Sequence, residues 1–248
     1  MINMSALYEH DDYETALESF RTTDCKWSAF VDVHMKVSQQ RCPICESPLD
    51  GSVARLTNSE NRVIIHATVD HYRPQNYYSF LKCNHKNYLL MCSECNNIYK
   101  GSQFPLHGST PTRATDEENI KDEKPLIVNP INDNLLELFI LVFKRSGEEL
   151  LLELKPKATA GYLYEKAVAT IRLFGLGDCE INRHHNDNVY NCRISVLQSH
   201  FGVFYEFVKA LNEENIEKAS LEFRANKDIF ESYGFYEFIK RNQFVVTV

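Results

Sequence analysis

The strongest constraint on this chain of 248 residues comes from two cysteine pairs, Cys42-Pro-Ile-Cys45 and Cys92-Ser-Glu-Cys95. Each C-x-x-C turn presents two thiolates on one side of a tight bend, and two such turns complete a tetrahedron around one metal ion. The segment between the pairs is too short for a core of its own, so closing it by metal ligation would stabilise the fold. We therefore predict a structural Zn²⁺ site. A set of buried thiols or a redox pair is the alternative.

The other four cysteines lack this spacing, and we expect them to be reduced, partly buried thiols. They are Cys25, Cys83, Cys179 and Cys192. The first residues contain neither a basic start nor an apolar stretch, and no run of about 18 apolar residues occurs in the sequence. We expect a cytoplasmic protein without a membrane contact.

Charge is distributed unevenly along the chain. The net charge is −7, which is the wrong sign for a protein that binds nucleic acid through bulk electrostatics. Residues 21–113 nevertheless carry +4, between flanks of −5 and −6. The basic segment could guide a phosphate backbone, whereas the acidic flanks would limit promiscuous binding or suit a basic partner protein. Candidate phosphate contacts are Arg55, Arg62, Arg73, Lys82, Lys86, Lys100 and Arg113.

Hydrophobic periodicity outlines the elements around the cysteines. Residues 24–40 have apolar side chains at near-helical spacing, and they lead into the first C-x-x-C turn. Residues 62–70 are rich in β-branched side chains and residues 88–91 are apolar, which predicts two strands. The stretch after Cys92 would be a short helix that ends near Gly101.

The polar composition of residues 102–123 predicts a surface connection between two parts of the chain. Beyond it, residues 137–144 and 149–155 predict a β-hairpin, and residues 163–174 predict a helix. A second helix would carry an apolar stripe that packs in the core or binds a partner. The stripe comprises Ile194, Leu197, Phe201, Phe204, Val208 and Leu211.

Polar residues with catalytic potential lie between and just after the cysteine pairs. Hydrolysis of a phosphodiester needs a base for the attacking water and positive charge near the phosphate. Asp70 could bind a divalent cation while the neighbouring His71 faces the water, provided the chain turns at the strand end. A second oxygen ligand would come from Asn96 or Asn97 at the start of the helix. Asn87 would hold the intervening loop through hydrogen bonds to the backbone.

At these positions the chain closely resembles the HNH, or ββα-metal, endonuclease superfamily. The resemblance implies that His71 is the general base and that Asp70 and Asn96 bind the catalytic Mg²⁺ or Mn²⁺. It also implies that Asn87 is the structural asparagine of the loop and that the four paired cysteines bind zinc. The superfamily often has His at this helix position, and because Asn97 follows Asn96 immediately, Asn97 remains an alternative ligand.

A narrower likeness covers residues 40–132. The segments TVDHYRPQ, NYLLMCSECNNIYKGSQFPL and PLIVNP are similar to PtuB-type HNH proteins of Septu and retron-linked antiphage systems. Such proteins act with a PtuA-type ATPase, so the resemblance implies a nucleic acid substrate and an ATPase partner. His85 and Asn129 stand where family members often carry tryptophan and aspartate, which affects packing and partner contacts more than chemistry.

These observations predict an α+β, mainly α-helical protein. An N-terminal helical segment would span residues 1–23, an HNH nuclease domain with structural zinc residues 24–113, and a mainly helical, partner-binding region with a β-hairpin residues 114–248. The expected function is metal-dependent cleavage of DNA or RNA in antiphage defence. The alternatives are a zinc-stapled module that binds nucleic acid or protein without cutting it, and a regulatory subunit of an ATPase assembly.

Overall fold

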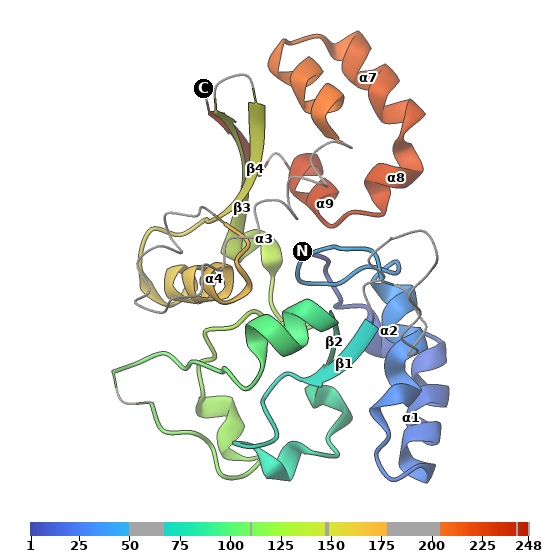
Figure 1. The fold of residues 1–248 in the computed structure, drawn as a ribbon, viewed down its shortest axis with the longest axis vertical. Helices are drawn as coiled ribbons and strands as arrows, with labels where there is room; N and C mark the ends of the chain where they lie inside the picture. The colour runs from blue at the N-terminus through green and yellow to red at the C-terminus, as the bar shows by residue number, and fades with distance from the viewer. Residues whose placement is uncertain (50–66, 110, 147–148, 178–203, 242, 248) are drawn as a thin grey trace.

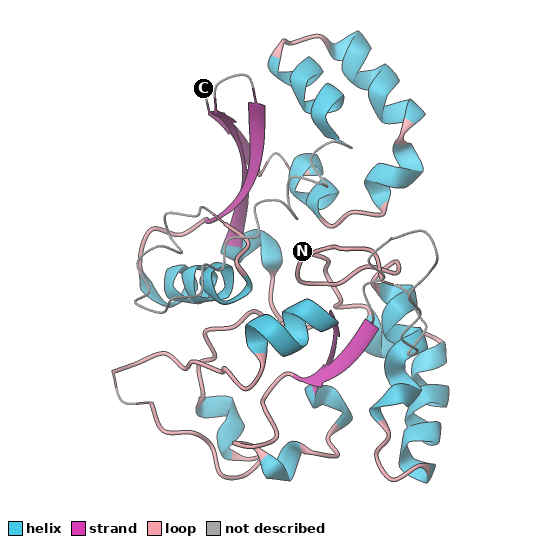
Figure 2. Cartoon of the chain, in the orientation of Figure 1, coloured by secondary structure: helices cyan, strands magenta, loops and turns pink. Residues whose placement is uncertain are grey.

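The computed structural model describes residues 1–49, 67–109, 111–146, 149–177, 204–241 and 243–247, which form a mixed α+β fold with two small sheets (Figures 1 and 2). Arg55, Arg62, Cys179 and Cys192 lie outside the described residues, as do Ile194, Leu197 and Phe201 of the predicted stripe. No helix in the described ranges combines the length and apolar character that a bilayer crossing requires.

Residues 67–100 form two antiparallel strands, joined by a loop, and then a helix that contains Cys95 of the second cysteine pair. Strand β1, Ala67–His71, pairs antiparallel with β2, Tyr88–Cys92, and places His71 opposite Tyr88. The helix η5, Glu94–Lys100, then packs on β2. The strand predicted for residues 88–91 is confirmed with one further residue, and the helix ends before Gly101 as expected. We call residues 67–101, together with the first cysteine turn, the finger.

The finger helix η5 has π-helical geometry. Its wide turn is closed by the Gly101 amide, which donates to the Asn96 carbonyl at 2.7 Å across five residues. Gly101 has φ +47°, a conformation that glycine adopts at little cost, so the chain can leave the helix there. π-Helical turns are often found at functional positions.

Two N-terminal helices pack beside the finger (Figure 1). Helix α1, Asp12–Thr22, buries Tyr13, Leu17 and Phe20 at helical spacing, and α2, Val31–Val37, contacts both finger strands. The single helix predicted for residues 24–40 is wrong in its first part. Asp24 and Cys25 have φ values of +53° and +60°, so a 3₁₀ turn, η2 at Trp27–Phe30, precedes α2.

Cys25 and Cys83 form a disulfide with a Cα–Cα distance of 5.4 Å. The prediction that these two cysteines are reduced thiols is therefore wrong. The bond joins the segment after α1 to the loop between β1 and β2, across 58 residues of sequence. Nothing in the local sequence around either cysteine marks the pair.

The chain after the finger packs against it before forming its own sheet. The segment of residues 102–123 contains the short helix η6, Asn119–Asp122, and ends at Glu123. The Glu123 carboxylate is 3.0 Å from the guanidinium of Arg73 in the finger. The Tyr72 hydroxyl donates to the Ile127 carbonyl at 2.7 Å. The predicted surface connection is thus anchored to the finger.

The predicted hairpin is confirmed as β3, Phe139–Ser146, and β4, Glu149–Pro156, after a short helix α3, Leu135–Leu138. The predicted helix is confirmed as α4, Gly161–Phe174, which packs on β4 and ends at Gly175 with φ +64°. A strand that the sequence patterns did not predict, β5 at Phe244–Thr247, pairs parallel with β3, so the sheet order is β4-β3-β5.

The remaining helices form a separate layer at one end of the molecule (Figure 2). Residues 204–212 are helical and bury Phe204 and Val208, as the predicted stripe requires. They are followed by three labelled helices, α7 at Ile216–Ala225, α8 at Lys227–Glu231 and α9 at Phe235–Lys240. Buried apolar residues connect these helices to the N-terminal segment and the finger in one cluster.

Candidate functional site

The sulfur atoms of the four paired cysteines converge at the base of the finger. All four are buried, and their Sγ atoms lie within 4.8 Å of one another. The Cys45 and Cys92 sulfurs are 3.7 Å apart, close to the roughly 3.8 Å expected between thiolates that share a tetrahedral Zn²⁺ at about 2.3 Å. The predicted cluster is confirmed, and its geometry is compatible with a structural metal such as zinc.

Backbone amides support the thiolate form of this cluster. The Cys92 amide donates to Cys42 Sγ and the Cys95 amide donates to Cys92 Sγ, each at 3.3 Å. Burial nevertheless raises the pKa of the Cys42 and Cys95 thiols well above the usual value. A bound cation would have to displace their protons, so metal binding and folding of the finger are coupled.

Asp70 forms an ion pair with the last residue of the finger helix. Lys100 Nζ lies 2.5 Å from Asp70 Oδ2 and donates to the His71 carbonyl oxygen at 3.0 Å. The Lys100 side chain is 0% exposed and that of Asp70 is 20% exposed. Among the described residues, no hydrogen bond reaches Asp70 Oδ1. Within that part of the chain, Oδ1 has no hydrogen-bond partner that would compete with a ligand.

Asn96 lies over the same face of β1 as Asp70. Its amide nitrogen donates to the Thr68 hydroxyl at 3.0 Å, and Thr68 precedes Asp70 by two residues on the strand. Asn96 and Lys100, four residues apart on η5, thus contact Thr68 and Asp70, two residues apart on one face of β1. The Asn96 side chain is half-buried, whereas Asn97 is exposed. No hydrogen bond to Asn96 Oδ1 occurs within the described part of the chain.

The His71 ring is held by the loop and by the neighbouring strand. Its Nε2 is 3.1 Å from the Lys82 carbonyl oxygen, and its ring centroid is 4.9 Å from that of Tyr88. A carbonyl only accepts, so Nε2 must carry the proton in the neutral ring, and Nδ1 is then the basic nitrogen. The strand includes both Asp70 and His71, so these side chains start from opposite faces of β1.

Asn87 anchors the two ends of the loop, as predicted. Its Oδ1 accepts from the Arg73 amide at 2.8 Å, and its Nδ2 donates to the Arg73 carbonyl at 3.0 Å. The Asn87 carbonyl also accepts from the Tyr72 amide at 2.7 Å. The buried amide thus stabilises the chain immediately after His71.

The predicted phosphate contacts separate into two groups. Lys82 and Lys86 are exposed, as that role requires. Lys100 is wrong as a phosphate contact, because its ammonium is fully buried against Asp70. Arg73 is engaged by Glu123, and Arg113 donates to the Tyr78 hydroxyl at 3.1 Å.

Sequence patterns missed Lys100 and Thr68 as parts of this site. A lysine at the end of a short helix usually reads as a solvated charge, and only its pairing with Asp70 distinguishes it. Thr68 gave one usable signal, since it precedes Asp70 by two residues and a strand places both on one face.

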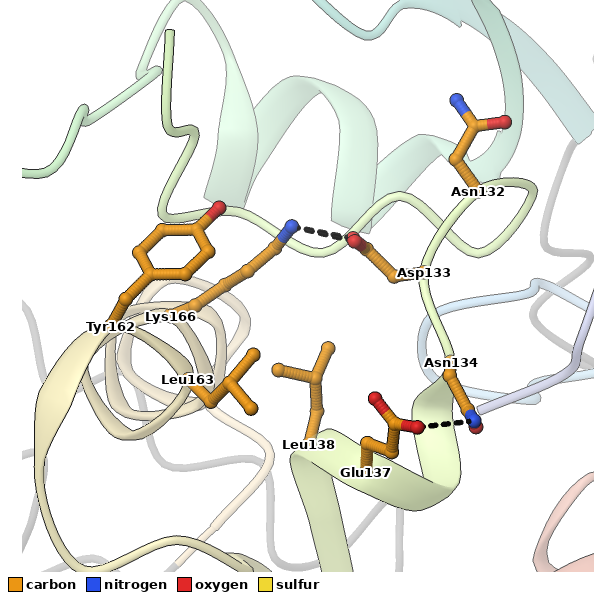
Figure 3. Close-up of a pocket in the computed structure, with 8 residues that line it drawn as sticks. All are labelled: Asn132, Asp133, Asn134, Glu137, Leu138, Tyr162, Leu163 and Lys166. Atoms are coloured by element: carbon orange, nitrogen blue, oxygen red, sulfur yellow. Dashed lines mark hydrogen bonds and ion pairs between the residues drawn. The ribbon is translucent and has the colours of Figure 1, made fainter.

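A pocket of 280 Å³ lies elsewhere, between the segment before α3 and helix α4 (Figure 3). Inside it, Lys166 Nζ is 2.7 Å from the Asp133 carboxylate, and the Asn134 amide donates to Glu137 Oε1 at 3.2 Å. It shares no residue with the finger site. Its main charged groups neutralise each other, so the pocket gives no indication of a ligand class.

None of the protein families, curated proteins or solved structures compared with the chain matches it.

Proposed function

We propose that the finger is the hydrolytic site of a metal-dependent HNH-type endonuclease that cleaves phosphodiester bonds in DNA or RNA. The observation that carries the proposal is the arrangement of β1 and η5. It gathers an available carboxylate oxygen of Asp70 and an available amide oxygen of Asn96 over one strand face, while His71 next to Asp70 has an oriented ring.

In this proposal His71 is the general base. With its Nε2 proton held by the Lys82 carbonyl, His71 Nδ1 can take the proton of an attacking water. Asp70 Oδ1 and Asn96 Oδ1 would bind a catalytic Mg²⁺ or Mn²⁺, because hard cations prefer such oxygens. When bound, that ion supplies positive charge to the developing phosphorane and the leaving oxygen. Asp70 would contribute its oxygen from strand β1, and Asn96 would contribute its oxygen from helix η5.

Lys100 is a positioning residue in this scheme. Its ammonium holds Asp70 Oδ2 and the His71 carbonyl together, so it fixes both candidate catalytic residues from beneath. It also limits Asp70 to one oxygen for a cation. The four cysteines would hold a structural Zn²⁺ that keeps β2 and η5 in place beneath these groups.

The resemblance of residues 40–132 to PtuB-type proteins adds the biological setting of the proposal. In this proposal the enzyme acts in an antiphage defence complex with a PtuA-type ATPase. A second function, a finger that binds nucleic acid or protein without cutting it, is favoured by one observation. Asp70 already has a buried cationic partner in Lys100, as a purely structural carboxylate would.

Purified protein with verified zinc content separates these functions. It is incubated with plasmid, single-stranded DNA and total RNA in Mg²⁺, Mn²⁺ or EDTA, with and without the ATPase partner. The proposal expects a product that requires the divalent cation while zinc stays bound. Binding without a product in every condition would establish the non-cutting module instead.

Neighbouring asparagines provide a matched pair of variants for the cation site. Asn96→Ala removes the amide that lies over β1, so cleavage should need a higher Mg²⁺ concentration. Asn97→Ala alters an exposed side chain one residue away and should leave that concentration unchanged. The reverse result would assign the ligand to Asn97.

A further inference from the structure

The Cys25–Cys83 disulfide adjoins the carbonyl that orients His71. Cys83 directly follows Lys82, whose carbonyl oxygen accepts from His71 Nε2 at 3.1 Å and from the Tyr88 hydroxyl at 2.7 Å. The disulfide therefore ties the residue next to Lys82 to Cys25, in the segment that joins α1 and η2, and so restrains the position of the Lys82 carbonyl.

Reagents in solution can reach this disulfide. Cys83 is exposed and Cys25 is half-buried, whereas the four cysteines of the metal cluster are buried. Accessible disulfides are commonly the labile and regulatory ones, and disulfides inside cells are usually redox-sensing. The two groups of cysteines thus differ in their access to solvent.

Other contacts hold the same loop less firmly. The Tyr13 hydroxyl is 2.8 Å from His85 Nδ1, and the Tyr8 hydroxyl donates to the Lys86 carbonyl at 3.4 Å. These contacts lie two and three residues beyond Cys83 and can break and re-form. They would keep the loop near α1 after the disulfide opens, without fixing the Lys82 carbonyl itself.

We propose that the Cys25–Cys83 disulfide is a redox switch for the finger site, with the oxidised form ordered for hydrolysis and the reduced form slowed. This inference rests on the proposed nuclease function. A dithiol reductant would give two electrons and two protons to the disulfide, leaving two thiols here and a disulfide on the reductant. An oxidising disulfide would reverse the exchange.

The switch acts through geometry. Opening the bond returns conformational freedom to the segment around Lys82, so the acceptor for His71 Nε2 loses its covalent restraint and keeps only the hydrogen bond from the Tyr88 hydroxyl. Misplacement of a catalytic group by about 1 Å can cost up to about 100-fold in rate, and we expect reduction to slow cleavage about tenfold or more.

The experiment compares oxidised and reduced protein with zinc content matched. Alkylation followed by mass spectrometry counts the thiols, and hydrogen exchange reports the order of residues 74–86. Cleavage is measured on the same samples. The variant Cys25→Ser/Cys83→Ser should behave like reduced protein and ignore the reductant. The variant Cys179→Ser/Cys192→Ser leaves the proposed switch intact and should respond as the natural chain does.

Faster exchange in residues 74–86 on reduction, together with slower cleavage that the Cys25→Ser/Cys83→Ser variant reproduces, supports the switch. Equal exchange in the two redox states would overturn it, as would equal cleavage by the two forms. If neither form cuts any substrate, the proposed nuclease function fails, and the switch of that activity fails with it. The exchange data then still show whether the disulfide orders the loop.

Discussion

The ion pair between Asp70 and Lys100 predicts an unequal response to removing either partner. The variant Asp70→Ala leaves a fully buried ammonium with only carbonyl acceptors, because the Lys100 side chain is 0% exposed. Breaking a buried pair in this way costs about 3–5 kcal/mol. The variant Lys100→Met leaves a carboxylate that is 20% exposed and can recruit water, so we expect about 1–3 kcal/mol.

Urea unfolding at pH 7, followed by circular dichroism with zinc in excess, measures both free energies of unfolding. The double variant Asp70→Ala/Lys100→Met should be less destabilised than the sum of the single variants, since each single change strands the other group. Equal costs for the single variants, a larger cost for Lys100→Met, or simple additivity would refute the reasoning.

The same pair affects how activity data on Asp70 should be interpreted. Loss of cleavage in Asp70→Ala can follow from loss of fold, so this variant alone does not identify a cation ligand. Lys100→Met removes a positive charge that lies 2.5 Å from the carboxylate, and it should therefore bind Mn²⁺ more tightly while cleaving more slowly. If Lys100 had a purely structural role, its replacement by Met would not tighten Mn²⁺ binding.

Three further predictions concern acid stability, metal removal and the loop. Burial lowers the pKa of His34 to about 3, so below pH 6.5 only the unfolded chain takes up this proton. The free energy of unfolding should consequently fall by about 2 kcal/mol between pH 6.5 and pH 5, and urea titrations of His34→Leu should show a weaker fall. The unfolded protein should release one Zn²⁺ per chain, as measured with a zinc-sensitive dye. The variant Cys95→Ser should release less Zn²⁺ and should melt at a lower temperature than the natural chain. Asn87→Ala loses two side-chain hydrogen bonds to Arg73 and should cost about 2 kcal/mol in the same titrations, whereas an unchanged midpoint would argue against the anchoring role.

Features with a short sequence range were predictable. The cysteine cluster follows from two C-x-x-C turns, and the β3–β4 hairpin follows from apolar runs on either side of one turn. The strand and helix that flank Cys92 follow in the same way, because local side-chain periodicity decides them. The roles of Asp70, His71 and Asn96 in catalysis stay predictions.

Features that depend on distant partners were not predictable. Strand β5 is stabilised by parallel pairing with β3, which places Phe244 opposite the sequence-distant Leu141. The Cys25–Cys83 bond joins residues without any characteristic spacing. Lys100 is buried only because the Asp70 carboxylate compensates its charge, and no helical pattern encodes that compensation. In each case the stabilising interaction joins parts of the chain that are far apart in sequence, so no local pattern could indicate it.

The most direct test of the account is the single-turnover cleavage rate of zinc-loaded protein with and without the His71 imidazole. The variant His71→Ala should fold and bind substrate normally while its rate falls by about 100-fold or more, the usual contribution of a general base. His107→Ala is the matched control, since that imidazole is 2.9 Å from Glu165 and outside the finger. Cleavage by His71→Ala at the rate of the natural chain would contradict the assignment of the base and, with it, the proposed mechanism.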